Sequence, residues 1–109
     1  MLKRLMTRPK YEGVIEAVRY TPEGHVNWVR AYERRGPTWS DHILIERQPL
    51  IERIKRGERF FAGERREYLG SEFEIGKPIR VLETDGGEVL VTGETQDAIK
   101  DSLSDVPVI

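Results

Sequence analysis

The chain has no cysteine among its 109 residues. This absence excludes a disulfide scaffold, a thiol nucleophile and any zinc site built on cysteine ligands. Long apolar runs are also missing, and no stretch approaches the roughly 18 apolar residues that a membrane-spanning helix needs. The basic N-terminal residues have no apolar run behind them, so we expect no signal peptide, no membrane association and a cytoplasmic protein.

Motifs for catalysis, nucleotides and metals are missing too. The glycines do not form a phosphate-binding loop, and the two histidines, His25 and His42, lack the spacing of a metal-ligand pair. Ser40, Asp41 and His42 have the residue types of a hydrolytic triad, but a triad needs side chains that converge from separate elements. A polar loop explains them more simply. We therefore predict no catalytic residue, no cofactor and no metal, and a protein that is not an enzyme.

Charge is abundant and unevenly distributed. Charged residues make up 34 % of the chain, and arginine far outnumbers lysine, a pattern compatible with surface ion-pair networks and a thermophilic source. Residues 83–109 hold seven acidic residues against one basic residue, Lys100. We expect a flexible basic arm over 1–10, one β-rich domain over 11–94 and an acidic segment over 95–109. The acidic segment either docks on the basic body or belongs to a mixed, solvated surface.

The clearest local pattern is a β-hairpin over 11–34. Two segments rich in β-branched and aromatic residues flank a Thr-Pro-Glu-Gly turn, in which Pro22 suits a type I turn and Gly24 the left-handed position after it. This turn places Thr21 opposite His25 and fixes the register of the other pairs. The expected pairs are Tyr20 with Val26, Val18 with Trp28, Glu16 with Arg30, Val14 with Tyr32, Glu12 with Arg34, Ala17 with Val29, and Ile15 with Ala31.

Short strands and one firm helix are expected after a loop over 35–42. Pro49 suits the first turn of a helix over 49–56, and Gly57 suits the position just past its end. Thr95 would cap a weak helix over 96–103. The expected strands are 43–45, 59–62, 72–75, 79–83 and 88–92. This pattern predicts an α+β fold, a small antiparallel β-barrel or strongly curved sheet of about six strands with one short helix and a weak C-terminal helix.

The most suggestive constellation lies on the second strand of the hairpin. The period of two puts alternate aromatic and arginine side chains on one face, and Tyr20 joins them across the hairpin. Arginines interleaved with aromatic rings suit single-stranded nucleic acid, whereas glutamates opposite those arginines favour intramolecular pairing. The candidate binding face comprises Tyr20, Trp28, Arg30, Tyr32 and Arg34, and a secondary basic patch comprises Arg56, Arg59, Arg65 and Arg66.

Both faces of the hairpin carry apolar residues, whereas a sheet with one wet face alternates more cleanly. Each face is therefore expected to meet the helix, the rest of the sheet or another chain. Our first functional hypothesis is a non-catalytic interaction module that binds a protein, or a second copy as a homodimer, through this hairpin. The alternative is a nucleic-acid-binding small β-barrel that uses the aromatic and arginine face, and an enzyme of unknown reaction is the third.

Overall fold

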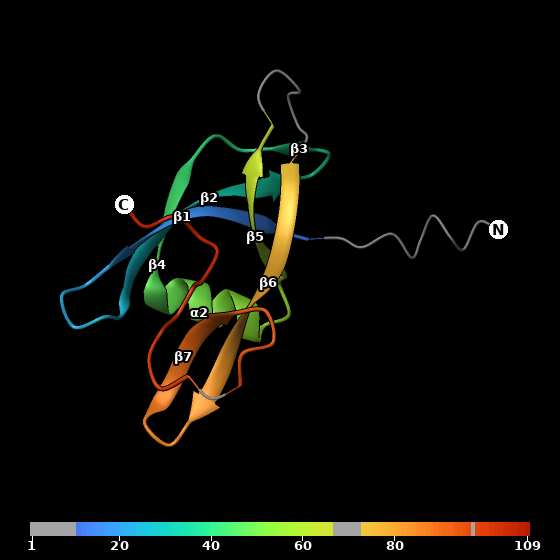
Figure 1. Cartoon of the computed structure of the whole chain (residues 1–109). Helices are drawn as coiled ribbons and strands as arrows, with labels where there is room; N and C mark the ends of the chain where they lie inside the picture. The colour runs from blue at the N-terminus through green and yellow to red at the C-terminus, as the bar shows by residue number, and fades with distance from the viewer. Residues whose placement is uncertain (1–10, 67–72, 97) are drawn as a thin grey trace.

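The computed structural model describes residues 11–66, 73–96 and 98–109, so the basic arm expected over 1–10 lies outside the described residues. The described elements form a strongly curved sheet with one short helix packed beneath it (Figure 1). The elements are β1 (Gly13–Tyr20), β2 (Val26–Arg35), β3 (Thr38–Trp39), β4 (Ile43–Glu46), α2 (Arg47–Lys55), β5 (Phe60–Arg65), β6 (Phe73–Thr84) and β7 (Gly87–Thr92).

The sheet curls into a half-barrel in the order β3-β2-β1-β5-β6-β7, and β4 pairs with β2 beside β3. This confirms the predicted α+β fold with a strongly curved sheet. The expectation of a purely antiparallel sheet was wrong in one place, because β1 and β5 run parallel. The reason is the path of the chain: α2 lies between β4 and β5 and carries it across the sheet before β5 joins β1.

The hairpin of β1 and β2 has the predicted turn and two bulges that the sequence did not reveal. Gly24 takes a left-handed φ of 94°, and the Thr21 amide donates to the His25 carbonyl at 2.7 Å. Glu16 and Asn27 are the extra residues of the two bulges, and their shifts cancel. The pairs Tyr20–Val26, Ile15–Ala31 and Val14–Tyr32 are therefore confirmed. The middle was predicted wrongly by one residue, with observed pairs Arg19–Trp28, Val18–Val29 and Ala17–Arg30.

Three other boundaries differ from the sequence prediction. The helix begins at Arg47, before Pro49, because the missing amide hydrogen of a proline is tolerated throughout the first turn. Segments 72–75 and 79–83 were expected as two strands, but β6 runs unbroken through Pro78. The loop expected over 35–42 contains β3, whose two residues pair with the end of β2. The expected strands 79–83 and 88–92 are confirmed as parts of β6 and β7, which form a hairpin closed by Thr84 opposite Gly87.

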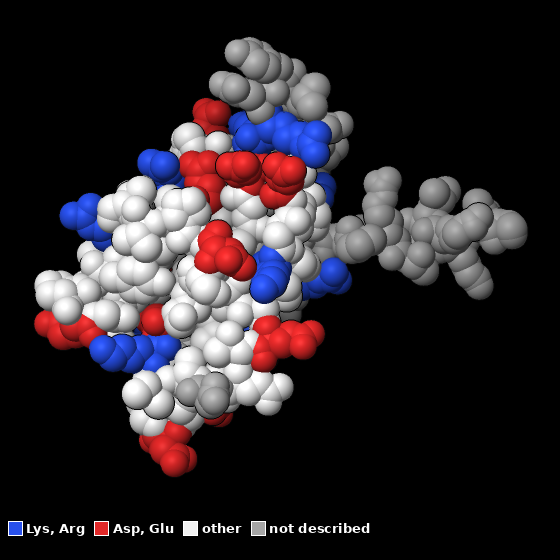
Figure 2. Space-filling view, viewed as in Figure 1, with Lys and Arg blue, Asp and Glu red and all other residues white. Residues whose placement is uncertain are grey.

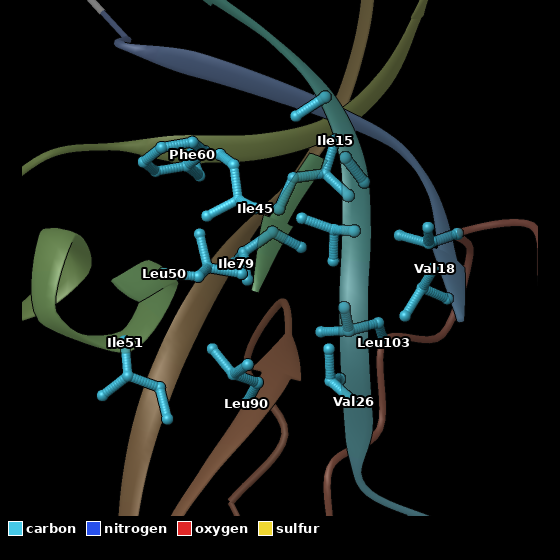
Figure 3. Packing of buried hydrophobic residues seen from close by; sticks show 14 residues of the cluster. Ile15, Val18, Val26, Ile45, Leu50, Ile51, Phe60, Ile79, Leu90 and Leu103 are labelled. Carbon is cyan, nitrogen blue, oxygen red and sulfur yellow. The ribbon is translucent and has the colours of Figure 1, made fainter. Parts of the chain in front are cut away.

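The hydrophobic core lies between the concave face of the sheet and α2 (Figure 3). Leu50 and Ile51 of α2 are buried, and the helix ends at Lys55, two residues before Gly57, which takes a left-handed φ of 103°. The bulge at Glu16 lets both Ile15 and Val18 of β1 face this core, and the bulge at Asn27 does the same for Val26 and Val29 of β2. The buried cluster comprises Ile15, Val18, Val26, Val29, Ala31, Ile45, Leu50, Ile51, Phe60, Ala62, Ile79, Leu90, Leu103 and Val106.

The C-terminal segment is extended, so the expected helix over 96–103 is wrong for the part of it that the structure describes. The Ser102 amide donates to the Leu90 carbonyl of β7 at 2.8 Å, and the Ile109 amide donates to the Val18 carbonyl of β1 at 2.9 Å. Ile99, which lies within the expected helix, is 85 % exposed. Long-range pairing with two strands satisfies the backbone that local helical hydrogen bonds would otherwise have satisfied.

Asp101 anchors this segment, although its side chain is fully buried. One carboxylate oxygen accepts from the Val26 amide at 2.7 Å and from Arg47 Nε at 2.8 Å. The other accepts from the Leu90 amide at 2.9 Å and from Arg47 Nη2 at 3.0 Å. We call Asp101, Arg47 and these two amides the Asp101 clasp. It joins β2, α2 and β7 to the C-terminal segment and leaves no carboxylate oxygen without a donor.

Acidic and basic side chains alternate with wide uncharged areas on the face seen in Figure 2. Among the described residues, no helix has the length and apolar character needed to cross a membrane. Ion pairs are distributed over the surface, including Arg53 with Glu58 at 2.8 Å and Lys55 with Glu88.

Candidate binding surface at the β4 edge

β4 forms an open edge of the sheet. Its four residues pair with β2 on one side, in the register Trp28–Glu46, Val29–Ile45, Arg30–Leu44 and Ala31–Ile43. In the described part of the chain, no strand pairs with its other side. Unpaired amides and carbonyls on such an edge can accept a further strand.

The side chains of β4 alternate between the core and the outer face. Ile45 is buried against the core, whereas Leu44 is 60 % exposed on the opposite face. Leu44 lies beside Arg30, and half-buried Trp28 lies beside Glu46 on the same outer face. Leu44 is thus an apolar side chain on an open edge strand, where an added strand could cover it.

A groove of about 420 Å³ runs along this edge. Residues from both sides of β4 line it, together with the first turns of α2, so the groove follows the strand edge itself. We call it the β4-edge groove, and its lining residues are Trp28, Ile43, Leu44, Ile45, Glu46, Pro49 and Arg53.

The structure separates the five residues of the predicted binding face. Trp28 lines the β4-edge groove. Tyr20 points to the other side of the sheet, where it packs against the core and its hydroxyl accepts from the Leu103 amide at 3.0 Å. The bulge at Asn27 explains this separation, because it shifts the alternation of faces between Val26 and Trp28.

The other three members of that face are held by intramolecular contacts. Arg30 Nε pairs with a Glu16 carboxylate oxygen at 2.9 Å, as the sequence predicted. Tyr32 is only 6 % exposed, so its ring cannot stack on a base. The Arg34 guanidinium lies 4.8 Å from the centre of the Trp39 ring.

Sequence analysis missed a cluster of aromatic side chains on the outer face. The ring centres of Trp39 and Phe73 are 4.8 Å apart, and those of Tyr32 and Phe73 are 5.2 Å apart. Tyr11 joins Trp39 at 5.5 Å, and Arg65 stacks over Tyr32 at 4.7 Å. The cluster covers the Tyr32 end of the outer face of the hairpin, so part of this face is buried within one copy, as the core face is. Its members come from separate elements, and only their aromatic character was visible in the sequence.

A polar network also joins residues that sequence analysis treated separately. His42 Nε2 lies 2.7 Å from a Glu16 carboxylate oxygen and 2.8 Å from the Tyr32 hydroxyl. Burial and the nearby Glu16 charge raise the pKa of Tyr32, and the positive charges of Arg65 and Arg30 oppose this only in part. The network fixes the ring of His42 at the start of β4. Ser40 does not join it, because its hydroxyl donates to the Asp41 carbonyl.

The secondary basic patch is spread over different environments. Arg56 pairs with Glu58 at 3.3 Å, and Arg66 lies 3.8 Å from Glu74. Arg65 belongs to the aromatic cluster, and exposed Arg59 follows α2. His25 is exposed at the hairpin turn. The described residues contain no group of three histidine, aspartate or glutamate side chains placed to hold a metal ion.

Comparisons with known proteins returned no match to a protein-family model, a curated protein or a solved structure. The surface is therefore interpreted from its own geometry.

Proposed function

We propose that this protein is a non-catalytic interaction module that binds an extended protein segment along the open edge of β4. The observation that carries the proposal is the β4-edge groove with Leu44 60 % exposed above it. Strand addition supplies affinity through backbone hydrogen bonds, and grooves beside the strand select alternate side chains. Trp28 and Leu44 would contact such a segment on the outer face.

The proposed interaction site lies on β4, beside the hairpin of β1 and β2, and not on the faces of the hairpin itself. Val14, Ala17 and Tyr32 of the outer face are buried within one copy, so they offer little surface to a partner. Leu44 and Trp28 retain solvent access, and the groove is also lined by Glu46 and by Arg53, whose charge is already paired with Glu58. A partner segment with alternating apolar residues suits this surface better than a uniformly charged one.

A protein partner is favoured over nucleic acid by the state of the arginines. Arg30 is paired with Glu16, and Arg34 is stacked on an aromatic ring, so neither is prepositioned for a phosphate. Fluorescence anisotropy with a labelled oligothymidine at low salt tests this choice. We expect no binding, whereas salt-dependent binding that Trp28→Ala abolishes would favour the nucleic-acid alternative.

A random dodecapeptide phage library panned against the full chain tests the proposed function. We expect enriched peptides with alternating apolar residues, and their synthetic forms should shift the amide resonances of Ile43–Glu46 in NMR titrations. Leu44→Lys should weaken binding at least tenfold, because it places a charge in the groove. Ile99→Lys is the matched control, since Ile99 is an exposed apolar residue outside the groove. Equal binding by both variants would refute the site.

A further inference from the structure

We infer that the segment bound at this edge is β4 of a second copy, paired antiparallel with Leu44 opposite Leu44. The inference rests on the proposed function and names its partner. Two-fold symmetric dimers are the commonest protein oligomers, and they require a surface that is complementary to itself. Residues 42–46 meet this requirement in one register only.

The register follows from the alternation of faces. If the two sheets continue with both helices on the same face, outer-face residues must oppose outer-face residues. The two-fold axis then passes through one residue of β4. An axis at Ile43 sets Leu44 opposite His42, and an axis at Ile45 sets Leu44 opposite Glu46. Each of these choices places the exposed leucine against a charged or polar side chain.

An axis at Leu44 matches every opposed pair. Leu44 meets Leu44, and Ile43 meets Ile45 on the core face. His42 of each copy lies opposite Glu46 of the other, so a carboxylate faces an imidazole at both ends of the paired segment. All five opposed pairs stay within residues 42–46, and neither helix, which starts at Arg47, lies opposite a strand residue.

The side chains on β2 extend the match across the outer face. Arg30 lies beside Leu44, and Trp28 lies beside Glu46. In the dimer, the two central leucines would therefore lie between the aliphatic stems of the two Arg30 side chains. Glu16 already neutralises each Arg30 guanidinium at 2.9 Å, which removes a repulsion that would otherwise oppose this arrangement.

The absence of cysteine makes the register directly testable. In Leu44→Cys, the two thiols would face each other across the axis, with Cα atoms about 4.5–5.5 Å apart, a separation that a disulfide bridges. In Glu46→Cys, the same register separates the thiols by four residues along the strand, or about 13 Å. We expect Leu44→Cys to form a covalent dimer under mild oxidation at least ten times faster than Glu46→Cys.

Light scattering on the full chain provides the second readout. We expect the mass to double with rising concentration in the micromolar range and Leu44→Lys to remain a single copy. Equal crosslinking of the two cysteine variants would overturn the register. A single-copy mass at high micromolar concentration would overturn self-pairing. If library peptides still bound at β4 in that case, the proposed function would stand without it; if they did not, both would fail.

Discussion

The strand edges at β7 and at β4 differ, because the first is covered by the chain and the second is open. At β7, the chain covers the edge itself: the Ser102 amide donates to the Leu90 carbonyl, and Asp101 accepts from the Leu90 amide. At β4, the described residues supply no such cover, and a groove follows the strand.

The two edges therefore differ in whether their backbone amides and carbonyls remain available to another strand. A strand edge is a row of donors and acceptors that another strand will satisfy, whether it comes from the same chain or from a different one. At the β7 edge, the buried carboxylate of Asp101 holds the C-terminal segment in place, so this edge contributes to the stability of the fold. The β4 edge instead carries a solvent-exposed leucine, so changes there should affect association and leave folding intact.

Loss of the Asp101 clasp should lower the free energy of unfolding more than any other change considered below. Asp101→Ala removes the acceptor of the Val26 and Leu90 amides and leaves Arg47 without its carboxylate. Removing one partner of a buried pair costs about 3–5 kcal/mol of unfolding free energy. Urea unfolding at about pH 7 measures it. Glu74→Ala is the control, because Glu74 is exposed and lies 3.8 Å from Arg66 in a surface ion pair; an equal loss in both variants would contradict the clasp.

The clasp also predicts a loss of stability in acid. Burial raises the pKa of Asp101, but the hydrogen bonds from Arg47, Val26 and Leu90 and the Arg47 charge outweigh it and hold that pKa below the ordinary value of 3.8. The ionised group therefore stabilises the fold fully above the unfolded-state pKa, and this contribution is lost as pH falls through the folded-state pKa. The stability difference between the wild type and Asp101→Asn should shrink below about pH 4. A constant difference would refute the assignment.

The open edge should tolerate a change that its buried neighbour does not. Leu44→Lys is expected to alter the unfolding free energy of the dilute protein by no more than about 0.5 kcal/mol, because the side chain is exposed. Ile45→Lys, one residue further on, should cost at least the roughly 2–5 kcal/mol of a core truncation. Urea unfolding of the two variants measures both changes. Similar losses of unfolding free energy would mean that the Leu44 side chain is not exposed in the monomer.

Hydrogen exchange compares the two edges without any substitution. We expect the Leu90 amide, held by Asp101, to exchange only on global unfolding. The outward amides of β4 should exchange rapidly in dilute protein and become protected as concentration rises. Rapid exchange at both edges would remove the distinction between them.

Local sequence signals predicted the elements well where the interactions are local. The turn at Pro22 and Gly24 predicted the hairpin and the outer pair Val14–Tyr32 correctly. The bulges at Glu16 and Asn27 could not be predicted, because a single extra residue in a strand leaves no distinctive residue type in the sequence. The Glu16–Arg30 pair survives the shift because both side chains are long enough to meet across it.

Features built from distant residues were not predictable. A helix was expected over 96–103, but the buried Asp101 within that range is satisfied by groups on β2, α2 and β7. The aromatic cluster brings Tyr11, Trp39 and Phe73 together from three parts of the chain. For the binding surface, sequence analysis identified Trp28 but not Leu44, whose exposure depends on which side of β4 stays unpaired.

The hydrogen bond from the Val26 amide to Asp101 joins residues 75 positions apart, which bears on the rate at which this protein folds. Contacts between such distant residues close a long loop before they bring any gain, so topologies rich in them cross the folding barrier slowly. We expect the clasp to form after the barrier, once the hairpin and α2 have met. Asp101→Asn should then mainly accelerate unfolding and leave the refolding rate nearly unchanged in a chevron plot, which makes the clasp a device for long native-state lifetime.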